Sequence, residues 1–240
     1  MRSAGQVVAV ALDAVFDALE PGITTAELDD IARRTIRAEG AKPAFLGLYG
    51  FPAVACISIN AEIVHGIPGE RIVSDGDLVS VDCGAIVDGF YSDHARTAVA
   101  GDNADDERLR LVDICRESLL QGIEQCVPHN RVGDISNAVE QFVRDAGFEL
   151  VREYVGHGVG RELHEAPPVP NVGNAGTGPL LMEGMTIAIE PMIMSGSWET
   201  KVLDDGWTVV TADGSLSAHF EHTVAITADG PEVLTSARNG

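Results

Sequence analysis

DLVSVDCGAIVDGFYSDHARTAV, residues 77–99, holds two apolar segments on either side of an Asp-Gly pair. Asp-Gly between segments of this kind is a strong signal for a β-hairpin with a two-residue turn. With Asp88-Gly89 as that turn, Gly84 lies opposite Asp93 on the neighbouring strand. The stretch therefore predicts an antiparallel hairpin.

Two carboxylates of this hairpin are predicted to share one face of the sheet. Asp82 lies two residues before Gly84, so its side chain points to the same face as Asp93. The two are diagonal neighbours, and we expect Gly84 to leave open space beside them. Both interrupt apolar strands, where like charges repel and burial is costly. A positive group must compensate them.

A helix pair is predicted before the hairpin and a similar pair after it. Residues 2–19 and 108–127 carry apolar positions at helical spacing, and each segment is followed by a second amphipathic stretch. Thr24 and Glu27 form a capping-box signature at the start of the first such stretch. Matched residues, each pair 107 apart, are Pro21 with Pro128, Leu28 with Ile135, Ile36 with Val143, and Gly40 with Gly147. The constant spacing favours two related halves over chance similarity of amphipathic helices.

Strand signals follow each helix pair. Besides the hairpin, they are AVACISIN (53–60), MTIAIEP (185–191), WTVVT (207–211) and LSAHFEHTVAIT (216–227). Asp213-Gly214 separates the last two and predicts a second hairpin. Because no Ser- or Gly-rich linker separates the halves, we expect them to share one sheet.

The second half offers its own acidic pair. Glu190 and Glu221 each interrupt an apolar strand, and Asp82 shifted by the 107-residue spacing falls next to Glu190. Any one of these acids could be a solvent-facing strand residue. Four acids at related positions of the two halves instead indicate a functional site. His157 lies between Gly156 and Gly158, and we expect these glycines to let the chain bend closely around it so that it reaches a metal. Together with His157, the four acids form a mostly oxygen ligand set. Such a set suits two divalent ions such as Mn, Co, Fe(II) or Zn.

Composition excludes several other classes of function. The net charge of −21 argues against binding to nucleic acid or to an anionic membrane surface. The four cysteines form no CxxC pair and are typical of free thiols in a reducing compartment. No apolar run approaches the roughly 20 residues of a membrane span. We therefore expect a soluble cytoplasmic protein.

The chain resembles the type I methionine aminopeptidases of the pita-bread metallopeptidase fold (M24 family) over nearly its whole length. The matching stretches are CISINAEIVHGIPG (56–69), DGDLVSVDCGAIVDGFYSD (75–93), REYVGHGVGRELHE (152–165), EGMTIAIEPM (183–192) and GWTVVTADGSLSAHFEHTVAIT (206–227). The resemblance implies an α/β (α+β) fold. Two pseudo-symmetric halves, about 1–103 and 104–235 of a single catalytic domain 1–240, share a curved antiparallel sheet with helices on its outer face.

The resemblance also implies the roles of individual residues. Two divalent metal ions are held by five ligands, among which Asp93 and Glu221 bridge. Glu190 shuttles a proton as well, while His65 and His164 contact the scissile amide and the tetrahedral intermediate. The implied ligands are Asp82, Asp93, His157, Glu190 and Glu221, and the implied pocket residues are Cys56, Phe51, Trp207 and Leu163. By position, Leu48 and Phe51 stand where bacterial relatives often carry tyrosines.

The resemblance implies removal of the N-terminal methionine from nascent proteins and peptides. It favours a monomer and leaves open a transient contact with the ribosome. Relatives usually begin several residues before the Met1-Arg2 position of this chain, so we expect either an upstream start or a shorter first helix.

Two alternatives remain open. The first is an Xaa-Pro aminopeptidase or dipeptidase of the same fold. The stretch YSDHART (91–97) is closer to those enzymes, although VHGIP (64–68) fits them poorly. The second is a pita-bread protein that has lost catalysis and serves as a binding module, but all proposed ligands are intact here.

Three further histidines lie near the proposed ligands in the sequence. His94 points to the opposite face of the strand from Asp93, and we expect His219 and His222 to be bystanders.

Overall fold

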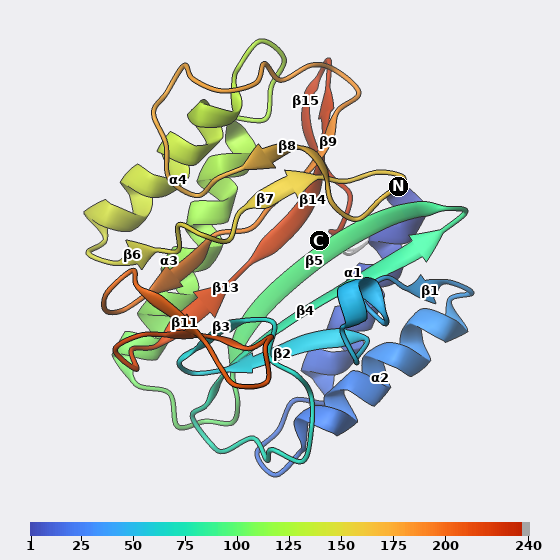
Figure 1. Cartoon of the computed structure of the whole chain (residues 1–240), viewed down its shortest axis with the longest axis vertical. Coiled ribbons are helices and arrows are strands. Elements are labelled where there is room, and N and C mark those ends of the chain that lie inside the picture. The colour runs from blue at the N-terminus through green and yellow to red at the C-terminus, as the bar shows by residue number, and fades with distance from the viewer. Residues whose placement is uncertain (237–240) are drawn as a thin grey trace.

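The computed structural model describes residues 1–236 and is organised around a nine-stranded antiparallel sheet (Figure 1). Its main strand order is β1-β4-β5-β14-β9-β7-β8, with β2 paired to β4 and β15 paired to β14. The strands are β1 (Lys42–Pro43), β2 (Ala55–Ile59), β4 (Leu78–Val87), β5 (Phe90–Val99), β7 (Gly156–Gly158), β8 (Glu165–Val169), β9 (Thr186–Ile189), β14 (Glu221–Thr227) and β15 (Gly230–Val233). The end of the expected domain, 237–240, lies outside the described residues.

Two three-stranded sheets make up the rest of the β structure within residues 1–236. One has the order β13-β10-β6 and the other β11-β12-β3. Their strands are β3 (Glu62–Val64), β6 (Glu149–Leu150), β10 (Met192–Met194), β11 (Thr200–Val202), β12 (Val209–Thr211) and β13 (Ser217–His219). A short 3-10 helix, η1 (Leu48–Gly50), precedes β2.

The predicted β4–β5 hairpin is confirmed residue by residue. Gly84 pairs with Asp93, and Val87 pairs with Phe90 across the turn. Both turn residues have positive φ, 51° for Asp88 and 75° for Gly89. This is the type I′ geometry that matches the twist of the flanking strands. The expected open space beside Gly84 is wrong, because an added Cβ there would lie 2.9 Å from the Ala44 side chain.

The two halves meet in the large sheet where β5 pairs with β14, as expected. Glu221 pairs with Ala95, and His222 pairs with His94. Next to these pairs, the Thr223 hydroxyl accepts from the Asp93 amide at 2.9 Å and donates to the Asp93 carbonyl at 2.8 Å. The Thr223 side chain thus extends the hydrogen bonding between β5 and β14 by one residue pair and holds the Asp93 backbone against β14.

In the described part of the chain, four α-helices cover the outer face of the sheet in two pairs, at opposite sides of the molecule in Figure 1. Their bounds are α1 (Arg2–Asp17), α2 (Thr25–Ala38), α3 (Asp106–Glu124) and α4 (Val132–Asp145). Thr24 and Glu27 form the predicted capping box of α2. The helix predicted over 108–127 ends early, at Glu124, where Gln125 and Cys126 turn back on Gly122 and Ile123.

Each helix pair has its own apolar core against the sheet. Around α1 and α2 the core includes Leu12, Leu28, Val79 and Val81, and around α3 and α4 it includes Leu111, Leu119, Ile135, Ile187 and Val224. Strand alternation then decides which residues are free for a site. On β4, Val81 and Cys83 face the helices, so Asp82 between them faces the opposite side of the sheet.

The hairpin predicted at Asp213-Gly214 is wrong. β12 pairs with β11 and β3, whereas the segment 216–227 divides into β13 and β14 in different sheets. The Asp213 carboxylate explains the difference, because it accepts hydrogen bonds from the amides of Ser197 and Ser215 at 2.7 and 3.0 Å. The turn therefore attaches to a neighbouring loop instead of closing a hairpin. Within residues 1–236, no helix combines the length and apolar character needed to cross a membrane.

Candidate metal centre and active site

One cavity of about 360 Å³ is lined by every site residue predicted from the sequence. It opens on the face of the large sheet opposite the helices. The selected residues that line it are Phe51, Cys56, His65, Asp82, Asp93, His157, Leu163, His164, Glu190, Trp207 and Glu221. They come from β2, β4, β5, β7 and β14 and from the segments that follow η1, β3, β7, β9 and β11. Residues from both halves of the chain therefore meet in one place.

The four carboxylates reach the cavity from neighbouring strands, and three of them are buried. Asp82, Asp93 and Glu221 are 9%, 4% and 2% exposed. Donor atoms of Asp93, His157 and Glu221 all lie within 4.8 Å of one another. Two carboxylate oxygens, Asp82 Oδ1 and Glu221 Oε1, are buried without any hydrogen-bond partner. An unpartnered buried carboxylate oxygen is costly unless a cation faces it.

His157 presents one ring nitrogen to the carboxylates. Its Nδ1 lies 2.9 Å from the Gly158 carbonyl oxygen, and because a carbonyl only accepts, Nδ1 carries the proton. Nε2 then has a free lone pair, 3.7 Å from Glu190 Oε1 and 3.9 Å from Asp93 Oδ2. A histidine held by its other N–H in this way is typical of a metal ligand.

The glycines beside His157 are needed for close approach of two backbones. Neither adopts a left-handed φ, and both belong to β7. A Cβ on Gly156 would lie 2.3 Å from the Ala188 carbonyl oxygen, and one on Gly158 would lie 2.3 Å from the Ala166 carbonyl oxygen. Only glycine lets β7 sit this close to its neighbours, so the bend predicted from these glycines is instead a tightly packed strand.

The electrostatics of the cavity favour a bound divalent cation. Burial raises the pKa of Asp93 to about 7 and that of Glu190 to about 8. Burial and the neighbouring carboxylates raise the pKa values of Asp82 and Glu221 well above their ordinary range. Among the residues that the structure describes around the cavity, none is a lysine or arginine. The donor set therefore fits divalent metal ions, which would supply the missing positive charge.

His65 and His164 lie on the cavity wall beside the cluster. The His164 ring centroid is 4.4 Å from that of His157, and the His65 ring meets Trp207 edge-on at 6.3 Å. Burial lowers the pKa of both histidines, which keeps them neutral near pH 7. A neutral imidazole can donate one N–H to an oxygen that gains charge.

An apolar wall forms the rest of the cavity. Phe51, Cys56 and Leu163 are at most 5% exposed and belong to one cluster with partly buried Trp207. The Phe51 and Trp207 rings meet edge-on with centroids 5.2 Å apart. Sequence reasoning missed several lining residues. They are Phe45, Tyr49, Val64, Glu153, Tyr154 and Val155.

Tyr49 is the most informative of the missed residues. It has a φ of 51°, is 77% exposed, and stacks on His164 with ring centroids 5.9 Å apart. Positive φ is uncommon for a bulky residue and marks a constrained position. The glycines on either side, Gly47 and Gly50, were the available signal for an unusual turn, but they do not indicate where the tyrosine ring lies.

The remaining histidines near the cluster differ in position. His94 and His222 stack on each other at 4.4 Å between centroids and do not line the cavity, as strand alternation predicts for His94. His219 was also expected to be a bystander. It is 1% exposed, and its Nε2 lies 4.0 Å from Glu190 Oε2 with no hydrogen-bond partner.

The chain is similar to known proteins over nearly its whole length. The family model of metallopeptidase family M24 matches residues 1–228. A methionine aminopeptidase of Clostridium perfringens is 54% identical over 98% of this chain and 94% of its own length. The crystal structure of a methionine aminopeptidase from Thermotoga maritima is 46% identical, covers 98% of this chain and 95% of that one, and superposes with a TM-score of 0.97. A prolidase from Pyrococcus furiosus shares the fold at 23% identity and a TM-score of 0.80, with 99% of this chain and 63% of that chain covered.

Proposed function

Because the chain belongs to metallopeptidase family M24, we propose that Asp82, Asp93, His157, Glu190 and Glu221 would hold two divalent metal ions. The chain is a metallo-aminopeptidase that removes the N-terminal methionine from proteins and peptides. One observation carries the ligand assignment: buried carboxylate oxygens without partners face a cavity whose described lining has no basic side chain other than histidine.

The metal ions explain why this reaction can proceed near neutral pH. When bound, two divalent ions would lower the pKa of the attacking water molecule and polarise the scissile carbonyl. Co, Mn, Fe(II) and Zn all suit this mostly oxygen ligand set with one imidazole.

The chain's own residues position the substrate and move protons. Glu190, a carboxylate that lines the cavity next to His157, accepts a proton from the attacking water and returns it to the leaving amine. His164 and His65 donate N–H groups toward the scissile amide and the oxyanion that develops from it. Both lie on the cavity wall beside the carboxylate cluster.

The apolar wall selects the side chain of the first residue. Phe51, Trp207, Cys56 and Leu163 form a contiguous surface next to the carboxylates. A flexible, unbranched thioether fits such a surface and makes favourable sulfur–aromatic contacts. We therefore propose that the methionine side chain packs against Phe51 and Trp207.

Substrate choice separates this function from Xaa-Pro cleavage on the same fold. The prolidase likeness supports only the fold, whereas the methionine aminopeptidase relatives cover nearly the whole chain. We expect the metal-loaded protein to hydrolyse Met-Ala-Ser and to leave Ala-Pro-Ala intact, as followed by mass spectrometry. Cleavage of Ala-Pro-Ala alone would overturn this assignment, and a protein that neither binds metal nor cleaves either peptide would be a binding module.

We further propose that the chain acts as a monomer in the cytoplasm. A single chain supplies the whole described cavity lining, and the four buried free thiols suit a reducing compartment. A net charge of −21 opposes binding to RNA, so we propose that any contact with the ribosome is transient. Light scattering of the purified protein tests the monomer.

We also propose that 1–103 and 104–235 are structurally related halves. Each contributes a helix pair with its own apolar core against the shared sheet.

A further inference from the structure

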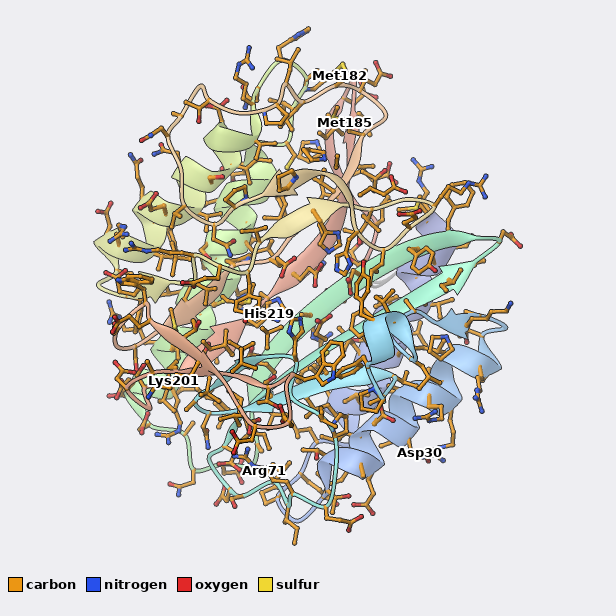
Figure 2. The ribbon with its side chains drawn as sticks, viewed as in Figure 1. Asp30, Arg71, Met182, Met185, Lys201 and His219 are labelled. Atoms are coloured by element: carbon orange, nitrogen blue, oxygen red, sulfur yellow. The ribbon has the colours of Figure 1, made fainter. Side chains whose placement is uncertain are left out.

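His219 is a buried polar side chain whose position the proposed function leaves unused. It is the last residue of β13, 1% exposed, and its Nε2 has no hydrogen-bond partner. Figure 2 shows it near the middle of the molecule, whereas the other labelled side chains lie toward the periphery. A buried imidazole nitrogen without a partner costs free energy, so its retention calls for a reason.

The fold directs this nitrogen at one carboxylate. His219 pairs with Met192 across β10 and β13, and Glu190 lies just before β10. His219 Nε2 is 4.0 Å from Glu190 Oε2, while His157 Nε2 is 3.7 Å from Glu190 Oε1. The two oxygens of Glu190 therefore face two different imidazoles.

The two imidazoles present different groups to Glu190. His157 uses its Nδ1 proton on the Gly158 carbonyl oxygen, so its Nε2 is a lone pair that suits a cation. His219 is not among the residues that line the cavity, and its Nε2 faces the other oxygen of Glu190. A neutral ring with its proton on Nε2 would satisfy both this nitrogen and the carboxylate oxygen that it faces.

The backbone of His219 is fixed by its neighbours. The Thr97 hydroxyl accepts from the His219 amide at 2.9 Å and donates to the His219 carbonyl at 2.8 Å. The terminal torsion of a glutamate is soft, so rotation of the Glu190 carboxylate is the easier way to close the gap. Catalytic hydrogen bonds are often long before substrate binds and shorten in the complex.

We propose that His219 is a positioning residue, whose neutral Nε2–H donates to Glu190 Oε2 and holds the plane of the proton-shuttling carboxylate. This inference rests on the proposed role of Glu190. His219 touches neither the cavity nor the substrate site, so it acts only through Glu190. It adds no charge to the cluster and leaves Glu190 Oε1 directed toward His157.

Two substitutions separate the donor from the bulk of the ring. In metal-loaded protein acting on Met-Ala-Ser, we expect His219→Leu to lower kcat by about 10- to 100-fold, the size of a lost hydrogen bond to a charged group, with little change in KM. His219→Gln keeps an N–H near the place of Nε2, and we expect it to recover most of the rate. Wild-type kcat in folded His219→Leu, or no recovery in His219→Gln, would overturn the proposal.

A matched control tests whether any lost histidine nearby has the same effect. His222 lies three residues along the chain, packs on His94 and does not line the cavity. We expect His222→Leu to lower the thermal midpoint while kcat stays near the wild-type value. An equal fall of kcat in His222→Leu and His219→Leu would show a general packing effect and contradict the proposal.

A double substitution with Glu190 and the metal content of the His219 variant together show how His219 acts. If His219 works through Glu190, adding His219→Leu to Glu190→Gln should lower kcat little further. If the two substitutions instead lower kcat by independent factors that multiply, His219 does not act through Glu190. Elemental analysis should find the same metal content in His219→Leu as in the wild type. Loss of metal would instead make His219 a ligand.

An NMR measurement that does not depend on catalysis completes the test. Long-range ¹H–¹⁵N spectra of the metal-free protein should show His219 in the tautomer protonated at Nε2, and the tautomer protonated at Nδ1 would overturn the proposal. If wild-type protein fails to cleave Met-Ala-Ser, the proposed function fails, and the tautomer still tests the contact with Glu190.

Discussion

At the scale of single residues, the cavity assigns different properties to His157 and His164, which are seven residues apart in GHGVGRELHEAP. His157 is 8% exposed, has its Nδ1 proton committed to a backbone carbonyl, and directs Nε2 at two carboxylates. His164 contacts the His157 ring and Tyr49 on the cavity wall. The pair therefore supplies one proposed ligand and one proposed contact to the substrate.

Glu190→Gln removes the proton-accepting group while keeping the shape of the side chain. We expect kcat to fall by about 10³-fold, within the range for loss of a general base. The assay is turnover of Met-Ala-Ser in metal-replete buffer, with metal content measured on the same sample. Wild-type turnover would refute the shuttle.

His164→Ala removes an N–H donor from the cavity wall. We expect kcat to fall by about 10²-fold, as for loss of one oxyanion donor, with metal content unchanged. Steady-state kinetics and elemental analysis measure both quantities. If the variant loses metal, His164 is a ligand and the division of roles between the two histidines is wrong.

At the scale of elements, local pairing could be predicted and pairing between distant segments could not. The Asp88-Gly89 turn fixes the register of β4 and β5, and thus the shared face of Asp82 and Asp93. By contrast, the signal at Asp213-Gly214 was misleading, because Asp213 bonds a loop that is remote in sequence. Nothing local indicates that β5 pairs with β14 or that Tyr49 reaches His164.

The tight packing of β7 gives a prediction at this scale. A Cβ on Gly158 would meet the Ala166 carbonyl oxygen at 2.3 Å, and backbone cannot move aside cheaply. We expect Gly158→Ala to reduce the free energy of unfolding by about 1–3 kcal/mol and to weaken metal binding through His157. Chemical denaturation and metal titration measure these effects.

Gly69→Ala is the matched control. An added Cβ there has no heavy atom within 4 Å, so we expect stability and metal affinity close to those of the wild type. Equal effects of the two substitutions would contradict the close-approach argument.

At the scale of the whole molecule, two apolar cores hold two helix pairs against one sheet, and the carboxylates collect on its other face. Folding therefore brings four acids into a place where they oppose one another when no metal is bound. This arrangement trades stability of the metal-free protein for a site that is ready to bind cations.

The metal-free protein should consequently lose stability as the pH rises above 6.5. Burial raises the pKa of Asp93 to about 7 and that of Glu190 to about 8, whereas in the unfolded chain such groups titrate near pH 4. Between these values the folded state binds more protons than the unfolded state, so the free energy of unfolding falls with rising pH. Calorimetry between pH 6.5 and about 8 should show a falling Tm.

The buried histidines do not mask the fall in stability over this pH range. Burial lowers the pKa of His157 to about 4 from 6.5, so its effect is a gain of stability with rising pH that is complete above 6.5. With metal bound, the carboxylates stay ionised and affinity for the metal rises with pH, so the gap in Tm between loaded and metal-free protein should widen. A metal-free Tm that is constant or rises over this range would contradict the assignment of the buried acids.

The central claim is that this cavity cleaves the bond after an N-terminal methionine by means of metal ions. The most direct test compares turnover of Met-Ala-Ser before chelation, after chelation with metal removal verified by elemental analysis, and after divalent metal is restored. We predict that turnover disappears with the metal and returns with it, and that N-acetylated Met-Ala-Ser is not cleaved at any stage. Undiminished turnover by verified metal-free protein would contradict the account.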